Sequence, residues 1–376
     1  MRYRYHWRTG NKVQLLIDGD QFFERMLAAI DGAEESLFLE FYMVSSGGVT
    51  DRFIEALTQA AGRGVRVCWI VDDFGGRHLR HDDEKRINQA GISLVRYNPI
   101  RLGKLKKNFF RDHRKLMLVD RKIGYIGGTG ISDEYLATVP ISESEPASWH
   151  EIMIQVEGPV ILDLLHLFAT QWRKISGEFI TDIELNYSAC GETKAKVATV
   201  QGAYQQDIKL AFVRHIRTSE NRVWLATAYF LPSLSVRRSL RLAARKGVDV
   251  RLIVAGPCTD HPWIYHASKR YYRRLLKAGV RIYEYQPSFL HTKLGVCDQW
   301  VSAGSCNLDH WNLRWNLEAN LEIVEPELTE QVIELLQSDM QRSREITYEK
   351  WQKRPWLLKL KELAWSIVSQ LLLKIR

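Results

Sequence analysis

The chain has 376 residues, of which 45% are apolar and 26% charged, and its formal net charge is +9. The length exceeds one ordinary domain, no run of about 18 apolar residues offers a membrane span, and five scattered cysteines exclude a disulfide framework. The positive charge favours an anionic partner, such as nucleic acid, a phosphorylated ligand or an acidic membrane surface.

The first half of the chain alternates predicted helices and strands. A helix is expected over Gln21–Ala33, and a β-rich run follows at Ser36–Val44. A second helix precedes an apolar strand within Gly62–Asp73, and a third precedes another strand within Ala90–Pro99. Strands that alternate with helices indicate an α/β domain with a largely parallel sheet.

A polar pattern interrupts the next predicted strand, at Arg111–Asp120, which reads RDHRKLMLVD. His113 and Lys115 are two residues apart, so their side chains project from the same face of a strand. Asp120 lies an odd number of residues after the histidine and therefore points to the opposite face. We expect it to fix the strand and its following turn.

The same order of elements recurs after a weakly patterned polar stretch at Lys174–Thr199. A helix is predicted over Gln206–Arg217, and the later runs Arg222–Pro232, Arg245–Gly256 and Ala278–Pro287 resemble the three earlier ones. One long repeat predicts two α/β halves related by a pseudo-twofold axis.

The repeat predicts a second copy of the polar pattern, and Leu290–Asp298 (LHTKLGVCD) provides it. His291, Lys293 and Asp298 have the spacing of the first set, and two such matches are far less probable by chance than one. Two such strands at a twofold seam would place two imidazoles and two ammonium groups around one cavity.

This set of groups suits reaction at a phosphate, without a metal or another cofactor. Two lysines can hold the non-bridging oxygens and stabilise charge that develops on phosphorus. One imidazole can attack phosphorus while the other protonates the leaving oxygen and then deprotonates the incoming alcohol or water.

A carboxylate should orient each imidazole, as in a catalytic triad. The candidates are Glu151 and Glu318, each of which begins a strand-like run after the histidine of its own half. We therefore expect Glu151 to serve His113 and Glu318 to serve His291. An exposed glutamate on an edge strand is the equally simple alternative for either.

At these residues the chain resembles the phospholipase D superfamily, whose mark is a pair of His-x-Lys-x4-Asp motifs, and within it the bacterial cardiolipin synthases. The resemblance extends from about residue 10 to residue 325, through GNKVQLLIDGDQFF, HRKLMLVDRKIGYIGG, VEGPV, HTKLGVCD and GSCNLDHWNLRWNLEAN. It is nearest to the shorter B-type synthases, which lack two N-terminal transmembrane helices.

The resemblance implies an α/β fold of two pseudo-twofold-related phospholipase D-like domains. Each has a mixed, largely parallel sheet flanked by helices, and the active site lies at the seam. Residues 1–180 would form the first domain, with the motif at 113–120, and residues 181–345 the second, with the motif at 291–298. Residues 346–376 would form a C-terminal basic amphipathic helix.

The resemblance also implies roles for individual residues. The nucleophile would be His113 and the acid and base His291, or the reverse. The family carries an asparagine where Gly130 stands, so a backbone N–H there is expected to replace that amide. The implied catalytic set is the six motif residues His113, Lys115, Asp120, His291, Lys293 and Asp298. The implied supporting residues are Glu151, Asn307, Glu318, Gly128 and Ser305.

The implied reaction is cardiolipin synthesis by phosphatidyl transfer between two phospholipids, expected to be phosphatidylglycerol, through a phosphohistidine. The alternatives are a hydrolytic phospholipase D or nuclease of the same superfamily, and an inactive membrane-tethering module. The basic, aromatic run 101–115 and the amphipathic tail 355–376 favour an anionic membrane surface over nucleic acid. A solvated loop and a packed helix are the competing interpretations. We expect a peripheral protein on the cytoplasmic face of the cell membrane, of unspecified oligomeric state.

Overall fold

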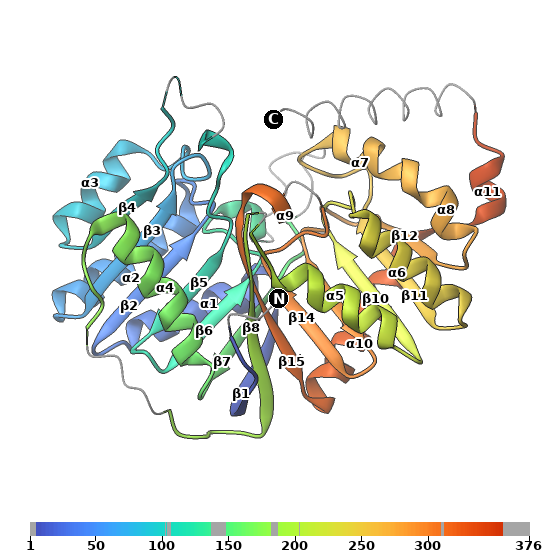
Figure 1. Cartoon of the computed structure of the whole chain (residues 1–376). Helices are drawn as coiled ribbons and strands as arrows, with labels where there is room; N and C mark the ends of the chain where they lie inside the picture. Colours follow the sequence, from blue (N-terminus) through green and yellow to red (C-terminus); the bar gives the residue numbers. More distant parts are fainter. Residues whose placement is uncertain are drawn as a thin grey trace.

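The computed structural model describes residues 5–101, 103, 107–136, 148–181, 187–202, 204–309 and 312–355. Two halves with the same order of elements lie side by side (Figure 1). The first half comprises β1 (Arg8–Ile17), α1 (Asp18–Asp31), β2 (Ser36–Phe41), α2 (Gly48–Gly62), β3 (Arg66–Asp72), α3 (His81–Gln89), β4 (Ser93–Tyr97), β5 (Lys115–Val119), β6 (Ile123–Gly127), β7 (Ile152–Glu157) and α4 (Ile161–Ser176).

The second half follows the same basic order, with a two-residue strand and two short helices inserted and a further strand and helix at its end. It comprises β8 (Thr193–Gln201), β9 (Gln205–Gln206), α5 (Asp207–Thr218), β10 (Arg222–Thr227), α6 (Leu234–Arg245), β11 (Asp249–Ala255), α7 (Pro262–Ser268), α8 (Tyr272–Leu276), β12 (Arg281–Tyr285), β13 (Lys293–Cys297), β14 (Trp300–Gly304), α9 (Asn312–Trp315), β15 (Leu317–Val324), α10 (Pro326–Gln341), β16 (Ser343–Ile346) and α11 (Tyr348–Gln352). The predicted repeat is therefore present as two matching sets of elements.

One mixed sheet runs through both halves. Its strand order is β4-β3-β2-β5-β6-β7-β1 in the first half and continues as β8-β15-β14-β13-β10-β11-β12-β16 in the second. The order is thus mirrored about the antiparallel pair β1–β8. The predicted mixed sheet is confirmed, but parallel pairing is limited to β2–β3–β4 and β10–β11–β12. Antiparallel pairing is more extensive than expected because β5 and β13 each form a hairpin with the next strand.

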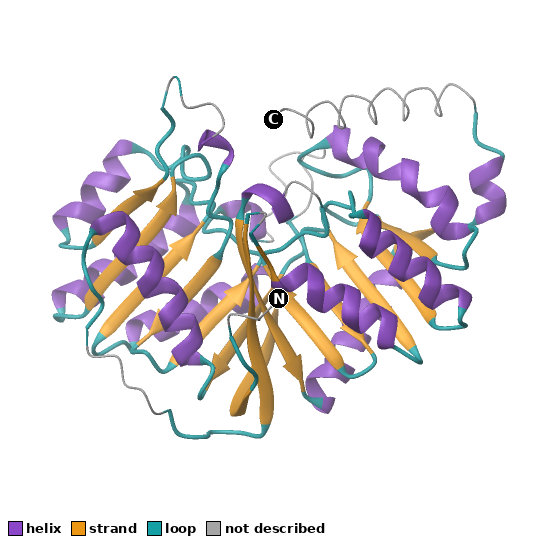
Figure 2. Ribbon diagram, viewed as in Figure 1, coloured by secondary structure: helices purple, strands orange, loops and turns teal. Residues whose placement is uncertain are grey.

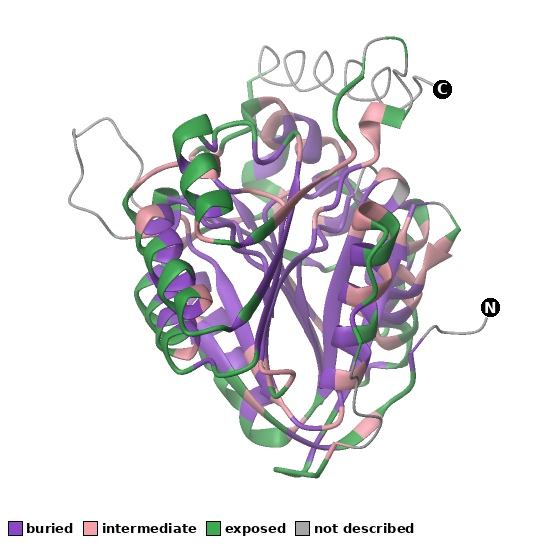
Figure 3. Cartoon of the chain, turned by 90° about the vertical axis from the view of Figure 1, so that its left-hand side faces the viewer, coloured by how far each residue is buried: buried purple, intermediate pink, exposed green. Residues whose placement is uncertain are grey.

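Helices cover the outer faces of the two half-sheets, and the inner faces pack on each other (Figure 2). The helices α1 and α2 bury apolar side chains on the first half-sheet, and α5 and α6 do the same on the second. Figure 3 shows the buried strands between helices whose outward sides are exposed. Of the helices in the described ranges, none combines the length and apolarity that a bilayer crossing requires.

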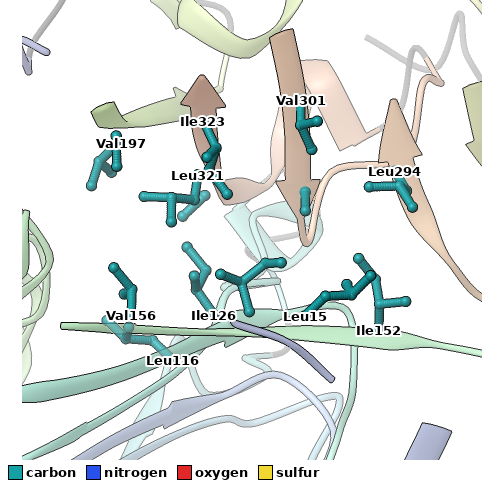
Figure 4. Packing of buried hydrophobic residues seen from close by; sticks show 14 of the residues in the cluster. Leu15, Leu116, Ile126, Ile152, Val156, Val197, Leu294, Val301, Leu321 and Ile323 are labelled. Carbon is teal, nitrogen blue, oxygen red and sulfur yellow. The ribbon is translucent and has the colours of Figure 1, made fainter. Parts of the chain in front are cut away.

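The interface between the half-sheets is a layer of aliphatic side chains (Figure 4). The first half contributes Leu15, Leu116, Ile126, Ile152 and Val156, which face Val197, Leu294, Val301, Leu321 and Ile323 of the second. All ten are buried. Burial of a side chain of this kind contributes about 1.5–3 kcal/mol, so this layer holds the two halves in a fixed relation.

Both motif aspartates lie at the ends of β5 and β13, away from the motif histidines. The carboxylate of Asp120 accepts backbone N–H bonds at the start of β2, from Glu34 (2.9 Å), Glu35 (2.7 Å) and Ser36 (2.8 Å). Asp298 accepts the equivalent bonds at the start of β10, from Glu220 (2.9 Å), Asn221 (3.0 Å) and Arg222 (2.9 Å). The expected structural role is confirmed, and grouping these two residues with the catalytic set was wrong.

Asp298→Ala should destabilise the second half without touching the site. The aspartate has a φ of 50°, which alanine adopts poorly, and three backbone N–H groups lose a charged acceptor. We expect a loss of about 2–4 kcal/mol in the free energy of unfolding, measured by chemical denaturation followed by circular dichroism. Asp298→Asn keeps an acceptor oxygen and tolerates this φ, so it should recover most of the stability. Equal losses in both variants would contradict the proposed bonds.

Candidate active site

Both motif histidines line one cavity of about 550 Å³ at the seam between the halves. The side chain of Lys115 also reaches this cavity. Most of the remaining wall is aromatic or aliphatic, and includes Tyr42, Phe74, Ile100, Tyr135, Trp149, Tyr229, Leu231 and Trp263. A polar floor under apolar walls suits an amphiphilic ligand with a charged head and hydrocarbon chains.

The chain before β5 pairs with the second half and thereby places His113. The His113 N–H donates to the carbonyl of Leu317 (2.9 Å), and the Leu317 N–H donates to the carbonyl of Arg111 (2.9 Å). The residue after Leu317 is Glu318, whose Oε1 lies 3.0 Å from Nδ1 of His113. The backbone pairing therefore delivers a carboxylate of the second half to an imidazole of the first.

The equivalent pairing on the other side places His291. Its N–H donates to the carbonyl of His150 (2.9 Å), and the His150 N–H donates to the carbonyl of Phe289 (2.9 Å). The next residue is Glu151, whose Oε2 lies 2.7 Å from Nδ1 of His291. In both cases Nδ1 is occupied, which leaves Nε2 as the ring nitrogen available for chemistry.

The glutamates are thus exchanged between the halves. We expected each to serve the histidine of its own half, and the structure contradicts that assignment: Glu318 serves His113, and Glu151 serves His291. The reason is that the segment before each motif strand hydrogen-bonds to the opposite half. The spacing along the chain identifies the two carboxylates but does not indicate which histidine each one contacts.

Gly128 and Ser305, which follow β6 and β14, support these glutamates in different ways. A Cβ at position 128 would lie 2.1 Å from Oε2 of Glu151, so only glycine leaves room for that carboxylate. The hydroxyl of Ser305 donates to Oε2 of Glu318. Gly128 therefore leaves room for one carboxylate, whereas Ser305 contacts Glu318 through its hydroxyl and His113 through its backbone.

Asn307 and Gly130 occupy equivalent positions after the two motifs, but their surroundings differ. The Asn307 side chain is fully buried, and neither of its amide atoms has a hydrogen-bond partner in the described part of the chain. Such a group costs about 1–3 kcal/mol unless a ligand satisfies it. A Cβ at Gly130 would lie 2.7 Å from the carbonyl oxygen of Met43, so an asparagine does not fit there without a shift. The Gly130 backbone instead hydrogen-bonds to the hydroxyl of Tyr135.

The two motif lysines are buried beside the carboxylates. Nζ of Lys115 donates to the carbonyl of His113 (2.6 Å). Nζ of Lys293 donates to Oε2 of Glu151 (3.0 Å) and lies 2.7 Å from Nδ1 of His291. The cations and carboxylates therefore form one connected group under the cavity.

Burial is the main cause of unusual protonation in this group. It lowers the pKa of Lys115 to about 7 and raises the pKa of Glu318 to about 8. Burial and the neighbouring lysines hold the pKa of His113 and of His291 well below the ordinary value. Without an anionic ligand, both imidazoles are neutral at pH 7.

Several residues of the site carry no motif and were missed from the sequence. The ring of Tyr42 lies 4.7 Å from that of His113, and Trp149 lies 5.0 Å from His291. The hydroxyl of Tyr229 donates to the carboxylate of Asp260 in the same cavity (2.6 Å). The repeat aligns Tyr42 with Tyr229, and that alignment could have identified both tyrosines.

Within the basic run 101–115, the residues from Phe109 onward are less exposed than expected. Phe109 and Phe110 pack on Trp315, with ring centroids 6.3 Å and 5.2 Å apart, and do not stand free for insertion into a membrane. Arg111 and Arg114 are buried in ion pairs with carboxylates. Most of the predicted amphipathic tail, residues 356–376, lies outside the described residues.

Comparisons with known proteins agree with this geometry. Residues 26–170 and 212–340 match the family described as "Cardiolipin synthase, PLD-like domain". Cardiolipin synthase A of Pseudomonas putida (strain W619) is 34% identical over 349 residues, which cover 91% of this chain and 71% of the relative. Cardiolipin synthase A of Pseudomonas aeruginosa (strain LESB58) is 32% identical over 345 residues, 91% of this chain and 69% of the relative. Both carry the A designation, whereas the motifs alone resemble the B-type.

Two crystal structures share the fold at low identity. Phosphatidylserine synthase of Haemophilus influenzae Rd KW20 superposes with a TM-score of 0.75 at 14% identity, covering 96% of this chain and 94% of that one. Polyphosphate kinase of Porphyromonas gingivalis superposes with a TM-score of 0.61 at 16% identity, covering 94% of this chain and 53% of that one. With the family match and the sequence relatives, these findings lead to one conclusion: the chain belongs to the phospholipase D-like family of cardiolipin synthases.

Proposed function

We propose that this phospholipid-modifying transferase is a cardiolipin synthase that joins two molecules of phosphatidylglycerol and releases glycerol. The observation that carries the proposal is the pair of motif histidines on one apolar-walled cavity, each with a buried lysine beside it and a glutamate from the opposite half. The division into domains at residues 1–180 and 181–345 is part of this proposal, because each would supply one set.

In the first step, Nε2 of His113 attacks the phosphorus of the donor lipid. The bond from phosphorus to the glycerol oxygen breaks, and that oxygen takes a proton from Nε2 of His291. The products are a phosphatidyl group on His113 and free glycerol. Nδ1 of each ring is held by its glutamate, which fixes the ring orientation and stabilises the positive charge that forms.

In the second step, the free hydroxyl of another phosphatidylglycerol loses its proton to His291 and attacks the same phosphorus. The bond from phosphorus to His113 breaks, and cardiolipin leaves. Lys115 and Lys293 stabilise the non-bridging oxygens in both steps, and the unsatisfied amide of Asn307 is a further donor.

The protonation of the site fits this order. A neutral His113 is the nucleophilic form, and its pKa is held low by burial and by Lys115. His291 must carry a proton when the leaving group departs. Asp260 opposes the lowering of its pKa, and the bound phosphate anion adds a further negative charge. A bound phosphate anion would therefore balance the positive charge of the buried lysines and of a protonated His291.

The proposed location is the cytoplasmic face of the cell membrane, with peripheral attachment. Both substrates are lipids, and the cavity that would receive them is lined by aromatic and aliphatic side chains. Phe74 and Ile100 on this lining are 42% and 54% exposed, so apolar surface continues from the cavity to the outside of the molecule. Such a rim favours contact with lipid over contact with nucleic acid.

The reaction is tested by incubating the purified chain with phosphatidylglycerol vesicles and EDTA, followed by mass analysis of the lipids. We expect cardiolipin and glycerol in equal amounts, because each transfer releases one glycerol. EDTA should not stop the reaction, because the lysines supply the charge that stabilises the phosphorane. Phosphatidic acid alone would identify a hydrolase. Cleavage of single-stranded DNA without any lipid product would identify a nuclease.

The roles of the histidines are separated by a donor with an activated leaving group, phosphatidyl-p-nitrophenol, which departs without a proton. His291→Ala should release one equivalent of nitrophenol per enzyme and retain a covalent phosphatidyl group, detected by mass. His113→Ala should give no burst. The reverse pattern would make His291 the nucleophile, and bursts from both variants would contradict the two-histidine mechanism.

The exchanged glutamates make a prediction with the same donor. Glu318→Gln weakens the nucleophile and should lower kcat about hundredfold with both donors, phosphatidylglycerol and phosphatidyl-p-nitrophenol. Glu151→Gln weakens the acid and should lower kcat with phosphatidylglycerol by a similar factor, while the nitrophenol burst is largely preserved. Glu334→Gln, on the exposed side of α10, is the matched control and should behave as wild type. If the two site variants exchanged their patterns, each glutamate would serve the histidine of its own half.

A further inference from the structure

A second cavity, of about 320 Å³, lies between α6 and the segment from the 3-10 turn at Lys269–Tyr271 to α8, outside the catalytic cavity. Five arginines and an exposed leucine form much of its lining: Arg237, Arg241, Arg270, Arg273, Arg274 and Leu234. None of these residues lines the catalytic cavity. A space enclosed by so many like charges is costly unless an anion occupies it.

Four of the five arginines are not balanced by an acidic side chain of the described residues. Within the described ranges, no carboxylate lies at ion-pair distance from Arg237, Arg241, Arg273 or Arg274. Arg237 instead stacks on Tyr271, with its guanidinium carbon 4.5 Å from the ring centroid, and donates to the carbonyl of Pro232. Burial and then the neighbouring arginines lower the pKa of Arg237, which records the same mutual repulsion.

Guanidinium groups at this density match the oxygens of a phosphate. The planar fork of each arginine can donate two parallel hydrogen bonds to one phosphate group. Arg237 and Arg241 come from one wall, and Arg273 and Arg274 from the other, so donors approach an anion from two sides. The cavity is large enough for a phosphodiester with a small head group and too small for the acyl chains of a lipid.

Two features indicate that the phosphate belongs to a membrane lipid. Leu234 on the cavity lining is 64% exposed, and Leu242 on the same helix is 40% exposed. Exposed leucines among arginines are typical of a helix that lies at a bilayer surface. The first wall also begins beside the catalytic cavity: Leu231 lines that cavity, and Leu234 follows it by only three residues, at most about 11 Å along the chain.

We propose that the arginine cavity between α6 and α8 binds the phosphate of an anionic phospholipid in the membrane, separately from catalysis. The bound lipid would hold this end of the second half on the bilayer, with the mouth of the catalytic cavity beside it. The inference concerns attachment, so it does not require that the proposed transfer reaction be correct.

The test is binding to vesicles, measured by sedimentation without any reaction readout. Arg241→Gln with Arg274→Gln removes one guanidinium from each wall. Arg238→Gln with Arg245→Gln removes the same charge from exposed positions of α6 outside the cavity. On vesicles of phosphatidylglycerol in phosphatidylcholine at about 0.1 M salt, the cavity variant should bind about tenfold more weakly, and the control should stay within about twofold.

Equal weakening of the two double variants would show a diffuse charge effect and overturn the proposal, and so would unchanged binding of the cavity variant. Arg273→Gln with Arg274→Gln changes only exposed side chains and repeats the test if the first variant does not fold. Calorimetry with sn-glycerol 3-phosphate distinguishes a lipid phosphate from a soluble one. If the arginines were needed to bind sn-glycerol 3-phosphate but not to bind vesicles, the cavity would be assigned to a soluble phosphate and the membrane role would be overturned. Loss of vesicle binding in a cavity variant whose circular dichroism spectrum matches that of the wild type supports it.

Discussion

Two hydrogen bonds, one from each motif imidazole to a glutamate of the opposite half, are the constraint on which the site depends. His113 relies on Glu318, and His291 relies on Glu151. Neither half therefore contains a complete catalytic unit, although each contains a complete motif. The backbone bonds that bring these residues together are as important as the side chains, because a shift of one residue in either bridge would turn the carboxylate away.

The same arrangement buries several charges in a small volume. Lys115, Lys293 and the two glutamates are all nearly inaccessible to solvent, and their ionisation depends on each other. His150, between the site and α10, shows the opposite behaviour to the catalytic imidazoles. Burial lowers its pKa, but its bonds to Asp18 (2.8 Å) and Asp339 (3.2 Å) outweigh burial and raise the pKa to about 10. The same imidazole ring is thus charged at His150 and neutral at His113 and His291 near pH 7.

Much of the fold and of the site could be predicted from the sequence, and the errors have physical causes. The repeat, the helices and the motif strands follow from hydrophobic period, and the outward direction of Asp120 follows from strand parity. The partner of each histidine could not be predicted, because it depends on which half the preceding segment joins. The extent of antiparallel pairing was missed for a similar reason, since βα periodicity describes only β2–β3–β4 and β10–β11–β12. The repeat could have identified Tyr42, whereas the place of Asp260 in the cavity depends on position in space and has no local pattern.

The antiparallel pair β1–β8 has a mechanical consequence. Because it joins the two half-sheets into one hydrogen-bonded surface, and because an aliphatic layer fills the space between their inner faces, the halves cannot separate like the jaws of a hinged enzyme. Substrates would therefore enter, and products leave, through the mouth of a preformed cavity. A lipid would then have to enter the cavity with its head group leading. The depth of the cavity, rather than a closing motion of the halves, would decide which part of the lipid reaches the histidines.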